Sequence, residues 1–467
     1  MASRENDPVH DSDMQDEDLL DADEAAEEIQ QDDDQPMDDE DEEEEIQLQN
    51  DSAAYFDSHA DSIFCIAQHP TNPGIVATGG GDDVAYVFDT TLAPGPVLPS
   101  SYESEPKPQG ERAGLPALQK LEGHKDSVNA IAFTLPKGDY LVTAGLDGQL
   151  RAHQSDKSAT QYKFFAEASE VQEINWVKPC PNPDQPNVIA LGANDGSVWV
   201  YQINHTDTSS PLTIVQAFYL HTASCTAGAW TPDGKLLATV SEDGSLYVWD
   251  VFETGQALVS QTAADQRFEI DGGLYSVACT SSIVAVGGAT GIIKVVGLPQ
   301  PADQSKKTKA GKGSNPTAAS AGQILASLHP QNESIETLSF SSAPLNILAA
   351  GSVDGSIVLF DTAHRFAVRR HIKEAHEEHA VVKLDFVRNP QKGAHILTSA
   401  GMDGVIRRWD VRGGTTAAGQ GFIQEWRGHR GDGEGGGVLD FVQGGGGNVT
   451  VSAGDDGVSL VFKTEIA

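Results

Sequence analysis

Histidine and aspartate residues recur along this chain at spacings that could support acid–base chemistry or a repeated structural bond. A histidine beside a carboxylate can act as a general base when a nucleophilic serine or cysteine lies within reach. No Ser-His-Asp or Cys-His arrangement is readable here, and HIKEAHEEH (residues 371–379) does not follow the His-Glu-x-x-His pattern of zinc sites. We therefore expect no catalysis, no cofactor and no metal. The histidines instead stand just before strand-like runs, at His59, His124, His221, His376 and His429.

A short signature contains the aspartates: small residues, an acidic–glycine turn and an alternating strand that ends in an aromatic residue. The clearest copy is SEDGSLYVWD (residues 241–250), where Trp249 follows the turn aspartate by six residues, as Trp409 does in a later copy. A degenerate copy has Thr290 at the turn. The eight copies are spaced mostly 47–53 residues apart, near the period of a four-stranded propeller blade. The turn aspartates are Asp82, Asp147, Asp195, Asp243, Asp354, Asp403 and Asp456.

These residues resemble the WD-repeat family over roughly residues 54–467. The resemblance implies that the histidine, the turn aspartate, a strand serine or threonine and the strand aromatic form a buried hydrogen-bonded set. Because buried imidazole and carboxylate groups need partners, we assign the five histidines, the seven aspartates, Trp249 and Trp409 structural roles. Repeats three, five and six lack the histidine, and Glu170, Gly272 and Glu333 lie near its place. We expect those blades to be held together less tightly.

Eight repeats predict an all-β fold: an eight-bladed WD40 β-propeller over residues 46–467, with a seven-bladed ring as the alternative. Two segments rich in Pro, Ser, Gly and Lys, at 91–118 and 299–321, explain the two long spacings and are expected to be flexible inserts. The last repeat ends at Phe462 without an outer strand. Residues 46–57 have strand character, and we expect them to supply that strand and close the ring.

Charge is distributed unevenly along the chain. The net charge is −39, and residues 1–51 contain 24 acidic residues against one arginine. Residues 1–45 have too few apolar groups to fold, so we expect a disordered acidic tail, either solubilising or attracting a basic partner. The remaining body is also acidic, which argues against direct nucleic-acid binding. Without a signal peptide, a membrane span or paired cysteines, we expect a cytoplasmic monomer, with nuclear entry left open.

The predicted partner site is a rim on one face of the propeller. The loops that enter the inner strands and the tight turns both lie there, and among the basic residues only Lys125 and Arg430 stand out. An acidic ring with aromatic anchors suits a basic peptide that carries apolar side chains, although a merely solvated rim is the alternative. The predicted binding residues are Asp61, Phe64, Asp83, Asp126, Glu170, Glu242, Tyr275, Glu333, Glu336, Glu377, Glu378, Asp432 and Asp455.

The first repeat, HADSIFCIAQHPTNPGIVATGGGDDVAYVFD, permits a closer comparison. With the acidic leader, the triple-glycine turn and Phe88 in place of tryptophan, it resembles the angio-associated migratory cell protein family. That family includes a fungal ribosome-assembly chaperone of a late-joining large-subunit ribosomal protein. The resemblance implies a ring that holds the basic N-terminal segment of a nascent ribosomal protein until its delivery to the large-subunit precursor. A histone or chromatin scaffold and a ubiquitin-ligase or signalling adaptor are the alternatives.

Overall fold

The computed structural model describes residues 49–92, 112–156, 158–204, 210–299, 321–388, 395–413, 418–430, 436–444 and 446–464. The chain divides into two units, residues 1–47 and 48–467, and all the described residues belong to the second. No helix among them is long and apolar enough to cross a membrane. The four cysteines are free, and three of them are buried.

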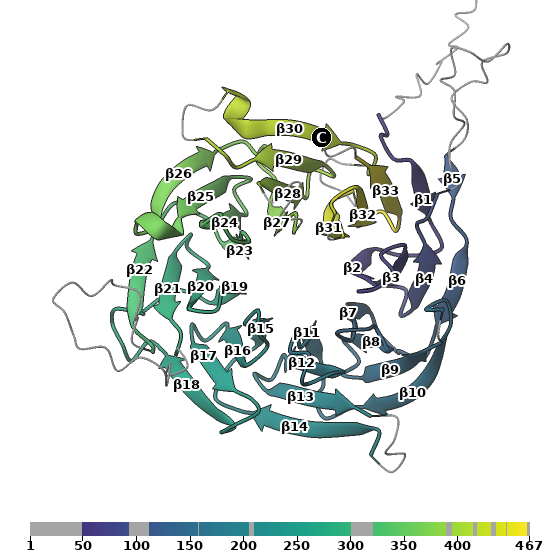
Figure 1. Ribbon diagram of the computed structural model, residues 1–467, viewed down its shortest axis with the longest axis horizontal. Helices are drawn as coiled ribbons and strands as arrows, with labels where there is room; N and C mark the ends of the chain where they lie inside the picture. The colour runs from purple at the N-terminus through teal and green to yellow at the C-terminus, as the bar shows by residue number, and fades with distance from the viewer. Residues whose placement is uncertain are drawn as a thin grey trace, which may run out of the picture. The chain divides into compact units, whose positions relative to one another are not determined.

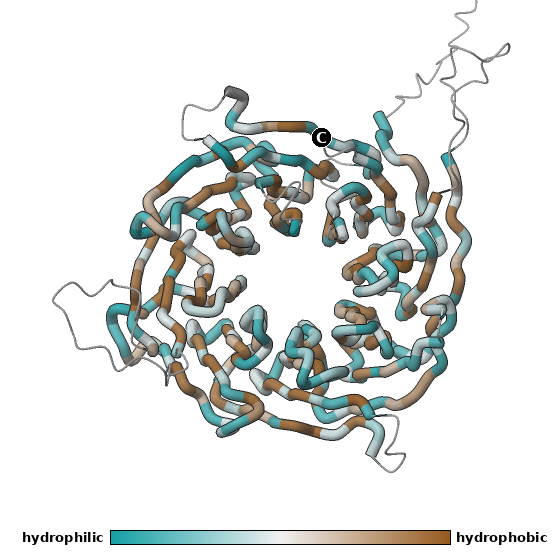
Figure 2. The backbone as a smooth tube through the Cα atoms, viewed as in Figure 1, coloured by the Kyte–Doolittle hydropathy of each residue, from teal (hydrophilic) through white to brown (hydrophobic). Residues whose placement is uncertain are grey.

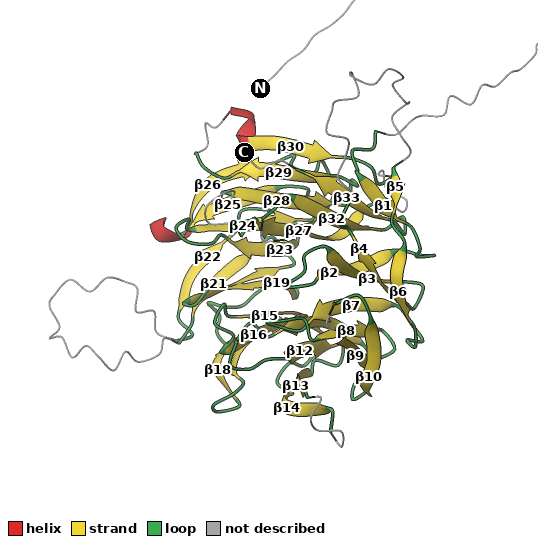
Figure 3. Ribbon diagram, turned by 45° about the vertical axis from the view of Figure 1, so that its right-hand side comes forward, coloured by secondary structure: helices red, strands yellow, loops and turns green. Residues whose placement is uncertain are grey.

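The second unit is an eight-bladed β-propeller, as predicted, so the seven-bladed alternative is wrong (Figure 1). Blades 1 to 7 are antiparallel sheets whose four strands run in chain order from the channel outward, whereas blade 8 adds β1 and β5 to three C-terminal strands (Figure 3). Blade 1 consists of β2 (Ile63–Gln68), β3 (Ile75–Gly80), β4 (Ala85–Asp89) and β6 (Ala117–Leu121), and blade 2 of β7 (Val128–Phe133), β8 (Tyr140–Gly145), β9 (Leu150–Ser155) and β10 (Tyr162–Ala168). Blade 3 consists of β11 (Ile174–Pro179), β12 (Val188–Ala193), β13 (Val198–Ile203) and β14 (Leu212–Phe218), and blade 4 of β15 (Cys225–Trp230), β16 (Leu236–Ser241), β17 (Leu246–Asp250) and β18 (Gln256–Gln261).

Blades 5 to 7 repeat this arrangement, and the eighth closes the ring. Two 3-10 helices, η2 (Thr362–His364) and η3 (Ala418–Gly421), precede the outer strands of blades 6 and 7. Blade 5 consists of β19 (Leu274–Cys279), β20 (Ile283–Gly288), β21 (Ile293–Gly297) and β22 (Ile324–Leu328), and blade 6 of β23 (Ile335–Phe340), β24 (Ile347–Ser352), β25 (Ile357–Asp361) and β26 (Ala367–Ile372). Blade 7 consists of β27 (Val381–Phe386), β28 (Ile396–Gly401), β29 (Ile406–Asp410) and β30 (Phe422–Trp426). Blade 8 consists of β31 (Val438–Val442), β32 (Val449–Gly454), β33 (Ser459–Lys463), β1 (Ala54–Phe56) and β5 (Ala113–Gly114).

Two segments distant in sequence complete blade 8. β1 pairs antiparallel with β33, with Tyr55 opposite Leu460, so the predicted closure by residues 46–57 is confirmed. β5 then adds a fifth strand, parallel to β1. β5 and the start of β6 lie inside the segment 91–118, so the prediction of a flexible insert is wrong for residues 113–118. These residues pair because they pass the open edges of β1 and β4, which offer unpaired backbone groups.

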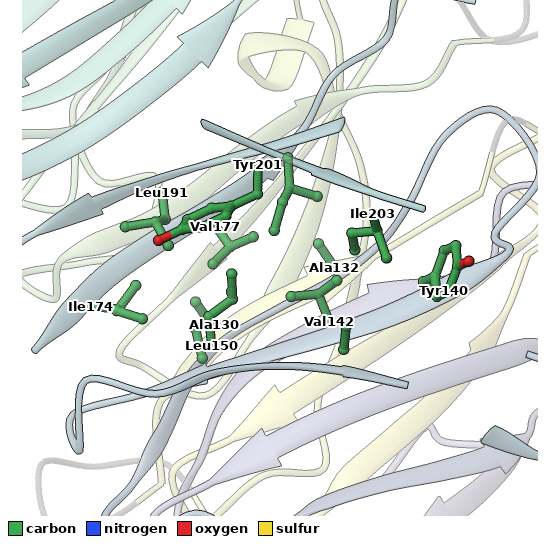
Figure 4. Close-up of a cluster of buried hydrophobic side chains, with 13 residues drawn as sticks. Ala130, Ala132, Tyr140, Val142, Leu150, Ile174, Val177, Leu191, Tyr201 and Ile203 are labelled. Atoms are coloured by element: carbon green, nitrogen blue, oxygen red, sulfur yellow. The ribbon is translucent and has the colours of Figure 1, made fainter. Parts of the chain in front are cut away.

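The core consists of separate wedges between neighbouring blades. Eight apolar clusters fill the eight junctions, and the one between blades 2 and 3 packs Val142 and Tyr140 against Val177 and Ile203 (Figure 4). Figure 2 shows the same distribution as apolar segments within the blades and hydrophilic segments toward the loops. The second strand of most blades is buried along its whole length because neighbouring blades cover both of its faces.

A ring of hydrogen bonds joins the inner strands around the channel. In six blades a side chain on the inner strand donates to a backbone carbonyl of the next blade: Cys65 to Val128, Asn129 to Ile174, Asn175 to Cys225, Thr226 to Leu274, Ser276 to Ile335 and Lys383 to Phe441. At the other two junctions a side chain accepts from the next inner strand, Thr337 from the amide of Leu384 and Asp440 from the amide of Ile66. Every blade is therefore tied to both neighbours.

Candidate functional site

The predicted His–Asp sets occur in the blades that carry the histidine, and they are buried rather than open to substrate. In blade 2, His124 Nδ1 lies 3.1 Å from Asp147 Oδ1, and its Nε2 lies 2.8 Å from the Thr143 hydroxyl. His59, His376 and His429 make the same pair of contacts in blades 1, 7 and 8. With both ring nitrogens engaged, these imidazoles hold the loop before the inner strand against the turn of their own blade.

Blades 4 and 7 add the strand tryptophan to the set. Trp249 Nε1 donates to the Thr239 hydroxyl at 2.8 Å, and Trp409 Nε1 donates to Ser399 at 2.9 Å. In blade 4 the direct pair is looser than in the other blades. His221 Nδ1 is 3.9 Å from the Asp243 carboxylate and contacts the Ser245 hydroxyl instead, at 2.7 Å. Burial lowers the pKa of His221 to about 4, so this ring is neutral near pH 7.

Blade 7 also contains a buried guanidinium. Arg407 is ion-paired with Asp403 and with Glu425, the latter at 3.1 Å. Although burial opposes ionisation, the contacts from His376 and Arg407 lower the pKa of Asp403 to about 2. A carboxylate held this way stays ionised and bound to the blade, so it is unavailable as a general base.

The blades without the histidine use other groups in its place. In blade 3 the Tyr201 hydroxyl donates to Glu170 at 2.6 Å. In blade 6 the histidine's place is taken by Gln331, whose Nε2 donates to the Ser356 hydroxyl at 2.8 Å, and Glu333 lies two residues later. Gln331 is 2% exposed, whereas Glu333 is exposed. Gln331 precedes the turn residue Asp354 by 23 residues, the offset that also separates His59 from Asp82, so the spacing was the available signal. Asp195 and Asp354 each accept a hydrogen bond from the serine two residues on.

One face of the propeller carries the histidine loops and the aspartate turns, and we call it the top face. Consecutive strands alternate in direction, so the connections before each inner strand and those between the second and third strands emerge at the same end. The hydrogen bonds from histidine loop to turn confirm this. The eight turns (81–84, 146–149, 194–197, 242–245, 289–292, 353–356, 402–405 and 455–458) contain ten Asp or Glu and no Lys or Arg.

The predicted binding residues that the structure describes differ in how free they are. Asp455 is half-buried and accepts a hydrogen bond from the Ser62 hydroxyl at 2.7 Å across the junction of blades 8 and 1. Glu170 is tied to Tyr201, and Asp83 and Tyr275 are half-buried. Asp432 lies outside the described residues. The exposed ones are Glu170, despite its bond to Tyr201, and Asp61, Phe64, Asp126, Glu242, Glu333, Glu336, Glu377 and Glu378.

The sequence prediction missed several apolar side chains on the top face. Leu146 and Val353, each just before a turn aspartate, are 37% and 38% exposed. Tyr219 and Leu220, just before His221, are 64% and 50% exposed. Each of them stands just before a turn aspartate or a repeat histidine, and this position in the sequence could have identified them. The top face therefore combines carboxylates with apolar contacts, and a pocket of about 300 Å3 between blades 8 and 1 is lined by His59, Ala60, Asp61, Ser62, Arg430, Asp455, Asp456 and Gly457.

Comparison with known proteins agrees with this geometry. Residues 51–89, 116–153 and 212–250 match the family described as "WD domain, G-beta repeat". Over 451 residues the chain is 30% identical to ribosome assembly protein SQT1 of Saccharomyces cerevisiae, which covers 90% of this chain and 88% of that protein. The chain belongs to the Sqt1 family of WD40-repeat proteins. The human angio-associated migratory cell protein is a more distant member, 25% identical over 427 residues, covering 88% of this chain and 80% of that protein.

Solved Sqt1 structures match this fold over nearly their whole length. The Chaetomium thermophilum Sqt1 crystal structure is 48% identical, with a TM-score of 0.76, and covers 89% of this chain and 98% of that chain. A second structure of the same protein, 49% identical with a TM-score of 0.76 and covering 89% and 100%, is bound to the N-terminus of ribosomal protein L10. The computationally designed Ika8 protein is 19% identical and supports the fold alone.

Proposed function

We propose that this Sqt1-family protein is a dedicated chaperone of a large-subunit ribosomal protein of the L10 type. It binds the basic N-terminal segment of the newly made protein on its top face and holds it until delivery to the large-subunit precursor. The observation that carries the proposal is the Sqt1 structure, 49% identical, that holds the L10 N-terminus. Among the described residues, no group of three His, Cys, Asp or Glu is arranged to hold a metal ion.

The charge of the top face supports this proposal. Unassembled ribosomal proteins are cationic because their extensions bind RNA phosphates. The exposed carboxylates of the top face provide a surface of opposite sign: Asp61, Asp126, Asp195, Glu242, Glu333, Glu336, Glu377 and Glu378. Phe64, 38% exposed on the inner strand of blade 1, adds an apolar contact at the channel mouth. Release would follow from competition by ribosomal RNA, whose charge density exceeds that of the protein rim.

The test is a charge reversal on the top face with a matched control. Glu242→Lys with Glu336→Lys should weaken binding of an L10-type N-terminal peptide at least tenfold, because two attractive contacts become repulsive. Asp184→Lys with Glu253→Lys changes the net charge equally, but these exposed residues lie in loops at the opposite end of their blades. Isothermal titration of the full chain should give wild-type affinity for that control. Equal losses in both double variants would show that only total charge matters, and no loss in either would exclude the top face.

A further inference from the structure

The outer edge of blade 3 carries an exposed aromatic cluster that the acidic rim does not explain. Tyr219 immediately follows β14, the outer strand, and at 64% it has the highest exposure among the large apolar side chains described. Leu220 beside it is 50% exposed. The half-buried Trp199 meets the Tyr219 ring edge to face, with centroids 5.8 Å apart and an interplanar angle of 86°. We call Trp199, Tyr219, Leu220 and Glu170 the outer ledge.

A carboxylate belongs to this cluster because blade 3 has lost its histidine. Glu170 stands near that place and accepts the Tyr201 hydroxyl at 2.6 Å, while the Tyr201 ring is stacked on Trp199 with centroids 6.3 Å apart. Burial, the bond to Glu170 and the nearby Tyr219 hydroxyl together raise the pKa of Tyr201. Glu170 itself remains exposed. Tyr201 and Trp199 therefore connect the Glu170 carboxylate to the open ring of Tyr219.

The ledge is held in place and lies on the top face. A methyl group at Gly196, in the turn of blade 3, would lie 2.9 Å from the His221 carbonyl oxygen and 2.6 Å from that of Ala223, so the loop packs directly on the turn. The Tyr247 hydroxyl donates to the Leu220 carbonyl at 3.4 Å and anchors the loop to blade 4. Because the turn of blade 3 and Tyr247 of blade 4 both hold this loop, its backbone is fixed although the side chains of Tyr219 and Leu220 are exposed.

Resting on the function proposed above, we propose that the outer ledge binds one arginine or lysine side chain of the client, away from the channel mouth. A cation over a tyrosine ring is attracted by the ring quadrupole, and Glu170 adds a charge-assisted hydrogen bond. Leu220 can cover the aliphatic stem of the same side chain. The site is thus a second contact for the basic segment, continuous with the acidic turns at Asp195 and Glu242.

The width of the blade fixes the spacing between the two contacts. Three strand separations divide the inner strand β11 from the outer strand β14, which is about 14 Å. An extended chain covers roughly 3.3 Å per residue, so about four residues of client span the distance. The ledge should therefore select a cationic residue about four positions from the one held at the mouth.

The experiment uses the full chain and a synthetic L10-type N-terminal peptide, with dissociation constants from titration calorimetry. Tyr219→Ala should weaken binding about threefold to tenfold, Glu170→Gln by a smaller factor, and Tyr219→Phe by less than twofold because the ring remains. Phe422→Ala removes another exposed aromatic, from the outer strand of blade 7, and serves as the matched control without effect. Thermal melts establish that each variant is folded.

A peptide series locates the contact. Each lysine and arginine of the peptide is replaced in turn by norleucine, and one replacement should lose its effect in the Tyr219→Ala background while all others keep theirs. If every replacement acts equally in both backgrounds, or if Tyr219→Ala binds normally while Glu242→Lys does not, the ledge is no client contact. A wild-type chain that fails to bind the peptide would overturn both proposals. A dimer of the free protein that Tyr219→Ala abolishes would assign the ledge to a second copy instead.

Discussion

At the residue scale, one position departs from the repeat in a way that measurement can detect. His153 stands where six of the other seven repeats have tryptophan, tyrosine or phenylalanine. It is 3% exposed, and its Nδ1 has no hydrogen-bond partner among the described residues. Burial and the neighbouring Arg151 lower its pKa to about 4. Burying a ring nitrogen without a hydrogen-bond partner lowers the stability of the fold, and a phenyl ring at this position would not have that penalty.

Replacing His153 with phenylalanine should therefore stabilise the protein, most of all in acid. The unfolded His153 has a pKa near 6.5, so as the pH falls from about 6.5 to 4 only the unfolded state takes up a proton, and wild-type stability is lost. His153→Phe removes this one contribution. Its advantage in the free energy of unfolding should grow from about 1 kcal/mol at pH 7 to roughly 3–4 kcal/mol near pH 4. Urea unfolding at four pH values measures it, and a pH-independent difference would contradict it.

The limits of prediction at this scale follow from side-chain length. The repeat spacing placed His59 and Asp82 correctly, because a histidine at a fixed distance from a turn has one geometry that fills both ring nitrogens. Where the histidine is absent, several side chains can reach the turn. The spacing marks the position, since Gln331 precedes its turn aspartate by 23 residues as His59 and His124 do, but it does not show which group is reached. Gln331 reaches the Ser356 hydroxyl, whereas Glu170 in blade 3 reaches Tyr201.

At the scale of the element, the strand that closes the ring should carry much of its stability. Phe56 in β1 is fully buried and stacks on Phe88 of blade 1 with ring centroids 4.2 Å apart, which joins blades 8 and 1. Phe56→Ala leaves a cavity at the junction and should cost about 3–5 kcal/mol. Phe422→Ala, at a residue 45% exposed in an outer strand, should cost less than about 1 kcal/mol. Denaturant unfolding measures the loss of stability in both variants. Equal losses would mean that the packing of β1 against blade 1 does not contribute the expected stability.

The strands of each repeat were easier to predict from the sequence than the contacts between strands of different repeats. Alternating apolar residues between acidic–glycine turns indicated four strands per repeat and a donated closing strand. β5 was missed because two residues, Ala113 and Gly114, carry no alternation of their own and pair only where β1 presents an open edge. The bonds between inner strands were missed for a related reason. The residues that make them vary in both place and type: Asn129 and Thr226 are the second residue of their inner strands, whereas Cys65 and Ser276 are the third.

At the scale of the whole molecule, the division of charge is the feature that the fold does not require. All the described strands of the propeller lie between residues 54 and 463, while residues 1–45 hold 23 acidic residues and one arginine. Fixed carboxylates on the top face can set the lifetime of a complex. Charge outside the contact region acts on approach, because long-range attraction raises the rate of encounter and is screened over about 10 Å at 0.1 M salt.

Deleting residues 1–45 should therefore slow association with a basic L10-type peptide without changing dissociation. At about 20 mM salt we expect the association rate constant to fall roughly tenfold, and the difference should vanish near 0.5 M salt, where the attraction is screened. A variant with every Asp and Glu in this segment changed to Asn or Gln is the matched control for length, and it should behave like the deletion. Stopped-flow fluorescence supplies both rate constants. A faster dissociation in either variant would mean that the segment contacts the client directly, and unchanged association would leave it no role in capture.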